Sequence, residues 1–186
     1  RLDAYVEPYY AWDSARPRDI ERPPLLYNFD RAGELDVNLA LVRAGYDCGR
    51  FRAAGGLAVG SYMDANYAAE PSGWQNVYEA SIGVRLREDA DLWLDAGVFP
   101  SHLGAESAIG ADNWTLTRSL AAENSPYYEA GLKLGYRTPD GRWFVSGLLL
   151  QGWQRISRVD GNDTPALGLQ VTWQPTDAFL INSSSF

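Results

Sequence analysis

Residues 127–137 read YYEAGLKLGYR, a stretch in which apolar and polar side chains alternate at nearly every position. One face collects the apolar set, which is Tyr128, Ala130, Leu132, Leu134 and Tyr136. The other face collects charged residues and glycine, which are Glu129, Gly131, Lys133 and Arg137. Successive side chains of a strand point to opposite faces, so this period of two predicts a β-strand with one apolar and one polar surface.

The same period of two recurs along the chain, whereas helical periodicity is scarce. It is clear in residues 35–46, 77–86 and 166–173 and weaker in residues 2–12, 51–62, 92–99 and 143–153. In the first of these, the apolar face is predicted to carry Leu35, Val37, Leu39 and Leu41. A ninth strand begins near residue 178. We expect a single domain over residues 1–186 with eight or nine strands of roughly ten residues, longer than the five or six residues typical of soluble proteins.

Short and long connections alternate between these segments. The short ones cover residues 47–50, 87–91, 138–142 and 174–177, and the long ones cover residues 13–34, 63–76, 100–126 and 154–165. Turn residues such as Pro139-Asp140-Gly141 mark the short connections. An up-and-down β-barrel has tight turns at one rim and long loops at the other, as bacterial outer-membrane barrels do.

Composition excludes several classes of function. The 186 residues carry 16 Lys+Arg against 24 Asp+Glu, so nucleic acid, which needs clustered positive charge, is not an expected partner. One cysteine, Cys48, and one histidine, His102, are too few for an internal disulfide or a His/Cys zinc site. We therefore expect no metal and no cofactor. No apolar run reaches the roughly 18 residues of a membrane-spanning helix, but a barrel strand crosses with about 9–11.

Aromatic residues make up 13% of the sequence and gather near the ends of the predicted strands. Tyr and Trp suit positions that are apolar on one side and wet on the other, and barrels carry aromatic girdles at both membrane interfaces. The residues assigned to these girdles are Tyr10, Trp12, Tyr62, Tyr78, Tyr128, Tyr136, Trp153 and Trp173. The alternative is that they are core aromatics of a soluble β-sandwich.

The central block of the sequence resembles a known family. It reads LWLDAGVFPSHLG at 92–104, DNWTLTRS at 112–119 and ENSPYYEAG at 123–131, with supporting pieces NYAAEP at 66–71 and QNVYEA at 75–80. These stretches are similar to the OmpL-like β-barrel porins of Gram-negative bacteria, the second porin family of that kind, and the likeness covers most of the chain.

The resemblance implies an all-β, antiparallel up-and-down transmembrane β-barrel in the bacterial outer membrane. It implies outer-membrane lipid and small hydrophilic solutes as partners and leaves a homo-oligomer open. Family members are longer and single-chain barrels have even strand numbers, so the chain is expected to be the N-terminal part of a larger barrel, incomplete at the C-terminus.

Polar side chains on the strands point into the lumen if the apolar face meets lipid, because Arg or Lys facing mid-membrane lipid costs about 2–4 kcal/mol. The predicted pore-lining residues are Asp3, Glu7, Asp36, Asn38, Arg52, Glu79, Arg85, Asp95, Glu129, Lys133 and Arg137. In that position they line an aqueous path and tune its selectivity. The alternatives are a salt-bridge network that fills the lumen and the solvated face of a soluble sheet.

The long connection over residues 100–126 is the second candidate feature, because loops of this length are usually functional or disordered. We expect it to fold into the barrel mouth and narrow it. The residues assigned to this constriction are His102, Glu106, Trp114, Arg118 and Glu123. The alternative is an external cap that packs on neighbouring loops.

Three functions of different classes follow. The first is a porin-type channel for passive diffusion, without chemistry, and the second is a structural or adhesive barrel with a plugged lumen. The third is a barrel-borne hydrolase that uses Ser101 and His102. Neighbouring residues of an extended chain point to opposite sides, which disfavours that pairing, so we expect no enzyme. A soluble lipocalin-like barrel is a minor alternative, with its apolar residues inside.

Overall fold

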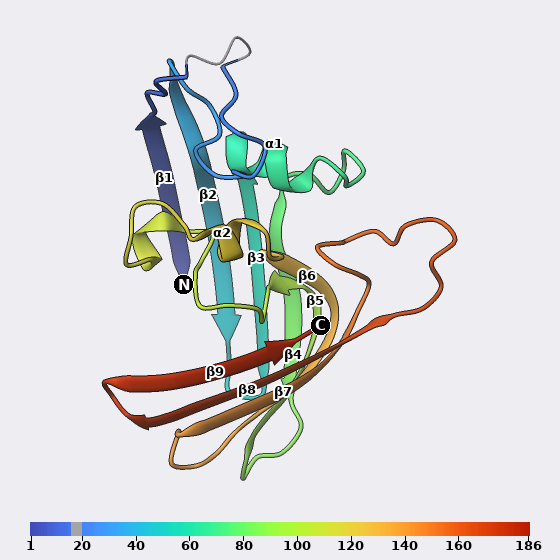
Figure 1. Ribbon diagram of the computed structural model, residues 1–186. Helices are drawn as coiled ribbons and strands as arrows, with labels where there is room; N and C mark the ends of the chain where they lie inside the picture. Colours follow the sequence, from blue (N-terminus) through green and yellow to red (C-terminus); the bar gives the residue numbers. More distant parts are fainter. Residues whose placement is uncertain (16–19) are drawn as a thin grey trace.

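The computed structural model describes residues 1–15 and 20–186 and folds them into one curled antiparallel sheet (Figure 1). Within these residues it has nine strands: β1 (Leu2–Tyr10), β2 (Leu35–Asp47), β3 (Phe51–Val59), β4 (Val77–Arg85), β5 (Asp91–Pro100), β6 (Tyr128–Arg137), β7 (Trp143–Leu150), β8 (Ala166–Thr176) and β9 (Phe179–Ser185). Each strand pairs with the next along the chain. The predicted all-β meander is therefore confirmed.

The connections also follow the predicted alternation. Four short turns lie at one end of the sheet, which we call the turn rim, and four long connections lie at the other, the loop rim. The long connections contain α1 (Ser61–Tyr67), the short 3₁₀ helix η1 (Gly110–Asp112) and α2 (Leu120–Glu123). Residues 16–19 of the first long connection lie outside the described residues. Within the described ranges, no helix has the length and apolar character needed to cross a membrane.

The sheet is strongly curved but open. Strands β1–β3 stand nearly upright in Figure 1, whereas β7–β9 cross them at a steep angle, so the sheet encloses a concave space. Among the described residues, β1 and β9 form its two edges and are not paired with each other. The concave space contains two segments. One is α1, which contacts β2 and β3, and the other is the connection between β5 and β6.

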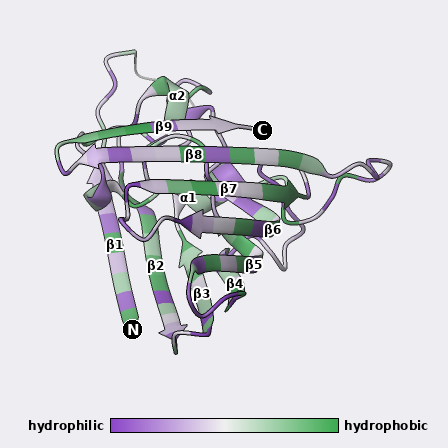
Figure 2. Cartoon of the chain, turned by 90° about the horizontal axis from the view of Figure 1, so that it is seen from below, coloured by the Kyte–Doolittle hydropathy of each residue, from purple (hydrophilic) through white to green (hydrophobic). Residues whose placement is uncertain are grey.

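Hydrophilic and hydrophobic residues alternate along the strands, as Figure 2 shows for β1 and β8, and exposure alternates along β1 in the same way. The convex surface carries exposed large apolar residues, among them Val6, Val42, Leu57, Ile82, Leu132, Leu134, Leu167, Leu169 and Val171. The intervening polar residues face the concave side, where they contact each other and the enclosed loops. The apolar surface therefore points outward, as the sequence predicts, and the lipocalin-like arrangement with an apolar interior is not what the sheet adopts.

Strand β2 departs from strict alternation at a β-bulge. The pairing with β1 skips Asn38 between the pairs Glu7–Leu39 and Pro8–Val37. Asn38 and Leu39 are both fully buried, and Leu41 follows Leu39 inward. The prediction that Leu39 and Leu41 share the outer face with Val37 is therefore wrong, because a bulge reverses the phase of every residue beyond it.

The third strand is shorter than predicted. It ends at Val59, and Gly60 turns the chain into α1 with a φ of 123°. A side chain at Gly60 would lie 2.6 Å from the Val37 carbonyl oxygen, so only glycine fits there. As a result Tyr62 and Met63 leave the strand and become fully buried on α1 in the concave space.

Strand β7 is apolar on both surfaces for two different reasons. Its outward side chains, Val145 and Leu149, are exposed on the convex face. Its inward side chains, Leu148 and Leu150, are buried with Phe99 in a small core cluster on the concave side. The uninterrupted apolar run over residues 147–150 thus reflects one face toward the exterior and one face toward the enclosed loop.

A charge on the convex face should be far more disruptive than the same charge one residue away. We expect Val171→Arg to lower the free energy of unfolding in lipid vesicles by about 2–4 kcal/mol, because it places a cation against hydrocarbon. Its neighbour Thr172 faces the concave side and bonds to Asn182, so Thr172→Arg should have a clearly smaller effect. Equal losses in urea unfolding of the two variants would contradict this orientation.

Candidate functional site

Three rows of side chains cross the concave wall at mid-height, and the strand registers define them. The cationic row contains Arg52, Gly83, Asp95 and Lys133 on β3–β6. The small row beside it contains Ala54, Ser81, Gly97 and Gly131. The acidic row contains Asp3, Arg43, Gly56 and Glu79 on β1–β4. Each row brings together residues that are far apart in the sequence.

An ion pair in the cationic row passes over a glycine. Arg52 and Asp95 are two strands apart, yet the Arg52 guanidinium donates from Nε to Oδ1 at 2.7 Å and from Nη2 to Oδ2 at 2.5 Å. Gly83 lies between them in the register. A Cβ at Gly83 would lie 2.9 Å from Arg52 Nε and would also collide with Asp95. The missing side chain therefore lets the pair form.

Further ion pairs and stacked aromatics continue this ladder. In the acidic row, Arg43 lies 3.8 Å from Asp3 and 4.0 Å from Glu79. Toward the turn rim, Asp91 lies 3.5 Å from Arg85 and 4.0 Å from Arg137. The indole of Trp93 donates to Asp91 at 2.7 Å.

Two guanidinium groups also lie close to the Trp93 ring. The Arg52 guanidinium carbon is 4.2 Å from the ring centre and that of Arg85 is 5.2 Å away. Arginine over an indole face is a favourable cation–π arrangement. Toward the turn rim, the concave wall is therefore a continuous network of cations, carboxylates and aromatic rings.

The predicted pore-lining residues lie on this wall. Their positions on the concave side follow from the registers and the exposure pattern: Asp3, Glu7, Asp36, Asn38, Arg52, Glu79, Arg85, Asp95, Glu129, Lys133 and Arg137. Sequence reasoning missed two charged residues of this wall, Arg43 and Asp91. Arg43 turns inward because of the β2 bulge, and Asp91 starts β5 one residue before the predicted strand. The bulge cannot be detected from the alternation of residues in the sequence. Asp91 could have been found, because it lies two residues before Trp93 and four before Asp95 and so shares their face of the strand.

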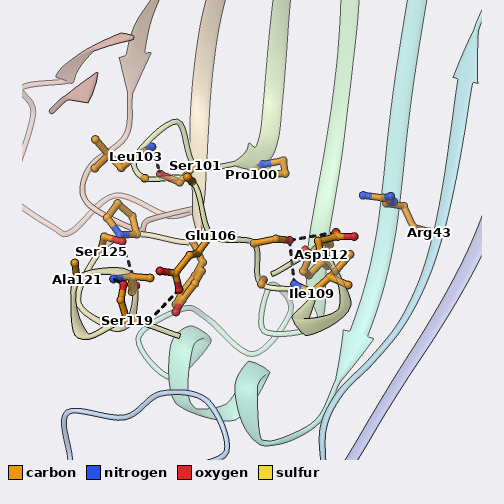
Figure 3. Close-up of a pocket in the computed structure, with 18 residues that line it drawn as sticks. Arg43, Pro100, Ser101, Leu103, Glu106, Ile109, Asp112, Ser119, Ala121 and Ser125 are labelled. Atoms are coloured by element: carbon orange, nitrogen blue, oxygen red, sulfur yellow. Dashed lines mark hydrogen bonds between the residues drawn. The ribbon is translucent and has the colours of Figure 1, made fainter. Parts of the chain in front are cut away.

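The connection over residues 101–127 folds across the concave space from β5 to β1; we call it the inward loop. Its backbone amide at Ala111 donates to the Tyr5 hydroxyl of β1 at 3.3 Å. Figure 3 shows how it faces Arg43 across a cavity of about 570 Å³. The predicted inward path is thus the one the chain takes, and a space remains between the loop and the wall.

Buried polar groups fix the inward loop in place. The Arg118 guanidinium donates to the carbonyls of Ser107 and Ala108. The Glu123 carboxylate accepts from the Tyr27 amide at 2.7 Å and from Asn28 at 3.2 Å. Burial raises the pKa of Glu123 despite these hydrogen bonds. The loop therefore packs against the β1–β2 connection as well as the wall.

Two other residues assigned to the constriction lie differently. Glu106 accepts from the Ser119 amide at 3.0 Å and so closes the loop on itself (Figure 3). Trp114 is fully exposed. Its assignment to the constriction stays a prediction.

His102 joins three strands at the start of the inward loop. Its Nδ1 lies 2.9 Å from both carboxylate oxygens of Glu129 on β6, and its Nε2 lies 2.9 Å from the Ser185 carbonyl oxygen on β9. Its own carbonyl accepts from Gln170 on β8 at 3.1 Å. Both partners of the ring only accept hydrogen bonds, so both ring nitrogens donate and the imidazole is cationic.

The environment of His102 sets its pKa accordingly. Burial by itself lowers the pKa, but the hydrogen bonds to Glu129 and Ser185 outweigh burial and raise it above the ordinary value. An imidazolium with both nitrogens engaged is not available as a base. Ser101 donates to Glu129 at 3.2 Å rather than to the ring. Ser101, His102 and Glu129 therefore do not form a nucleophile–base pair.

The aromatic residues assigned to the membrane interfaces divide into two groups. Five are at the surface near a rim: Tyr10, Trp12 and Trp153 at the loop rim, and Tyr136 and Trp173 at the turn rim. The other three, Tyr62, Tyr78 and Tyr128, are at most 7% exposed and belong to the buried cluster.

The prediction that these three tyrosines lie at the membrane interfaces is wrong, and each is buried for an identifiable reason. Tyr62 lies on α1, and its ring meets that of Tyr127 edge to face at 5.5 Å. Tyr128 stacks on Tyr67 at 4.1 Å and donates to Glu70 at 3.1 Å. Tyr78 enters the cluster at a register shift between β3 and β4. Loops that pack into the concave space therefore capture aromatic residues that the pattern assigns to the surface.

Comparison with known proteins decides the family. The family model described as "Putative beta-barrel porin-2, OmpL-like" matches residues 1–186. The chain belongs to this OmpL-like β-barrel porin family. No curated protein and no solved structure matches it significantly. Among the described residues of this porin, no cluster of three or more His, Cys, Asp or Glu side chains has the arrangement of a metal site.

The glycine in the cationic row provides a test of the porin's inner wall. We expect Gly83→Ala to lower the free energy of unfolding by about 1–3 kcal/mol, because the added methyl group separates Arg52 from Asp95 and overpacks the wall. Gly55 lies in the neighbouring strand β3, and a Cβ there meets nothing within 4 Å. Gly55→Ala is therefore the matched control. Equal stability of the two variants in urea titrations would refute the crossing pair.

The His102 bridge should make the porin's stability depend on pH. The folded pKa of His102 is raised, so its contribution is complete below the unfolded pKa of about 6.5 and is lost as pH rises through the folded value. We expect the free energy of unfolding to fall over that interval, and His102→Gln to remove this part of the pH dependence. Glu129→Gln should act similarly. Identical pH profiles for wild type and His102→Gln would exclude the bridge.

Proposed function

We propose that this chain forms the wall of an outer-membrane channel through which small hydrophilic solutes diffuse passively. The observation that carries the proposal is the opposition of the two sheet surfaces. Leucine, valine and isoleucine cover the convex face, whereas ion pairs such as Arg52–Asp95 cover the concave face. A sheet with hydrocarbon on one side and water on the other has this distribution.

The inward loop is the proposed constriction of this channel. It crosses the lumen at mid-height and is held by buried hydrogen bonds of Arg118 and Glu123 rather than by surface contacts. The cavity of about 570 Å³ beside it, lined by Arg43, Tyr78 and Asp112 among others, is the proposed path. Charged walls at such a narrowing select solutes by size and charge.

A plugged, structural barrel is the second candidate, and one observation favours it. On the loop-rim half, the concave space holds an apolar cluster that includes Tyr62, Met63, Tyr67 and Ile156. Glu70 reinforces this half by accepting from the amides of Ile156 and Ser157 at 2.8 and 3.0 Å. A packed upper half without a continuous path would give a barrel that does not conduct.

We propose no chemical reaction for this chain. The hydrolase hypothesis depends on His102 acting as a base for a serine, and the geometry assigns both ring nitrogens to acceptors of β6 and β9. In the proposed channel His102 instead joins the inward loop to the far strands.

Shortening the inward loop distinguishes the two candidates. If the loop narrows an open path, removing residues 105–122 should raise single-channel conductance in planar bilayers, because the deleted segment carries η1 and Arg118 across the lumen. The matched control removes residues 160–164 of the exposed β7–β8 connection and should leave conductance unchanged. Unchanged conductance in the first variant would overturn the constriction, and absence of conductance in the wild type would favour the plugged barrel.

A further inference from the structure

A hollow in the concave wall lies between the cationic row and the acidic row. Its volume is about 250 Å³. The side chains at its edge come from four strands: Arg52, Ala54, Glu79, Ser81, Asp95, Phe99 and Lys133. Ala54 and Ser81 of the small row line it between these charged groups, and both have short side chains. The hollow is thus a depression in the ladder of ion pairs, with opposite charges on its two sides.

The side formed by the cationic row carries one net positive charge. Arg52 and Asp95 neutralise each other through two hydrogen bonds of 2.7 and 2.5 Å. Lys133 is the third charged group of this row, so two cations and one carboxylate leave a charge of +1. In the described part of the chain, no carboxylate oxygen lies within 4.0 Å of the Lys133 ammonium. The ammonium rests instead 4.7 Å from the centre of the Phe99 ring.

The side formed by the acidic row presents the Glu79 carboxylate, which has no close cationic partner among the residues that the structure describes. Asp3 is already paired with Arg1, whose Nε donates to Oδ1 at 2.9 Å, and Arg43 lies 3.8 Å from Asp3 and 4.0 Å from Glu79. Both contacts of Arg43 are long, and neither is a hydrogen bond. The Glu79 side chain is only 12% exposed. Its carboxylate is therefore largely withdrawn from water without a close partner, a condition that favours binding of a cation.

We propose that this hollow binds a small zwitterion of the amino-acid class, with its carboxylate at Lys133 and its ammonium at Glu79. The volume is below the roughly 300–1,000 Å³ of drug-sized pockets, which suits a molecule of this size. Phe99 provides an apolar contact for the carbon skeleton. A ligand with a single charge would engage only one of Lys133 and Glu79, each of which lacks a close partner of opposite charge among residues 1–15 and 20–186. The proposal rests on the proposed channel, since it names a solute class for that lumen.

Calorimetric titration of the full chain folded in detergent micelles tests the site without requiring conduction. We expect L-alanine to bind saturably. Acetate carries only the negative charge of L-alanine and ethylammonium only the positive charge, so each should bind at least about tenfold more weakly. Lys133→Gln and Glu79→Gln should each weaken L-alanine binding by about tenfold or more. The charge-matched controls Arg87→Gln and Glu88→Gln change exposed residues of the β4–β5 turn and should bind as wild type.

Three results would overturn the proposal. These are non-saturable binding of L-alanine, acetate binding as tight as that of L-alanine, and unchanged binding in both Lys133→Gln and Glu79→Gln. The comparison of ligands uses the unaltered chain, so it holds even if a variant fails to show the heat-modifiable band of a folded barrel. Planar-bilayer conductance of the same preparation separates the two proposals. If the chain conducts but does not bind L-alanine, only the zwitterion site is overturned. If it binds L-alanine but does not conduct, only the channel is overturned.

Discussion

The two surfaces of the sheet have to stay in phase from one strand to the next, and the rest of the molecule depends on this constraint. A slip of one residue would carry a whole strand's leucines into the lumen and its charges outward. In the proposed outer-membrane channel, Arg or Lys facing mid-membrane lipid would cost about 2–4 kcal/mol, so eight antiparallel pairings must agree on one register. Where β2 breaks phase at Asn38, the two displaced residues are both buried beneath the enclosed loops. The bulge is therefore accommodated only because the concave space is filled at that level.

The inner wall uses the absence of side chains as much as their presence. Charged residues two strands apart can pair only if the position between them is empty, and Gly83 provides such a gap for Arg52 and Asp95. The small row leaves a second gap, the hollow between Lys133 and Glu79. Glycines that weaken an ordinary strand thus shape the charge pattern of this lumen.

The enclosed loops give the concave space two different characters. Toward the loop rim, tyrosines from α1 and the inward loop form an apolar cluster sealed by the hydrogen bonds of Glu70 and Glu123. Toward the turn rim, the wall is a ladder of ion pairs and aromatic rings. His102 lies at the boundary and joins the loop to β6, β8 and β9. This single residue therefore couples the position of the loop to the curvature of the sheet.

The sequence by itself determined the strands, their order, the alternation of turns and loops and the inward direction of most wall charges. These features are local, because period-two alternation and turn residues are readable within ten or so positions. Only the tertiary structure decided the inward turn of Leu41 and Arg43, the burial of Tyr62, Tyr78 and Tyr128 and the exposure of Trp114. Each of these depends on which residue of a neighbouring strand or loop fills the adjacent space, and alternation along one strand carries no information about that neighbour.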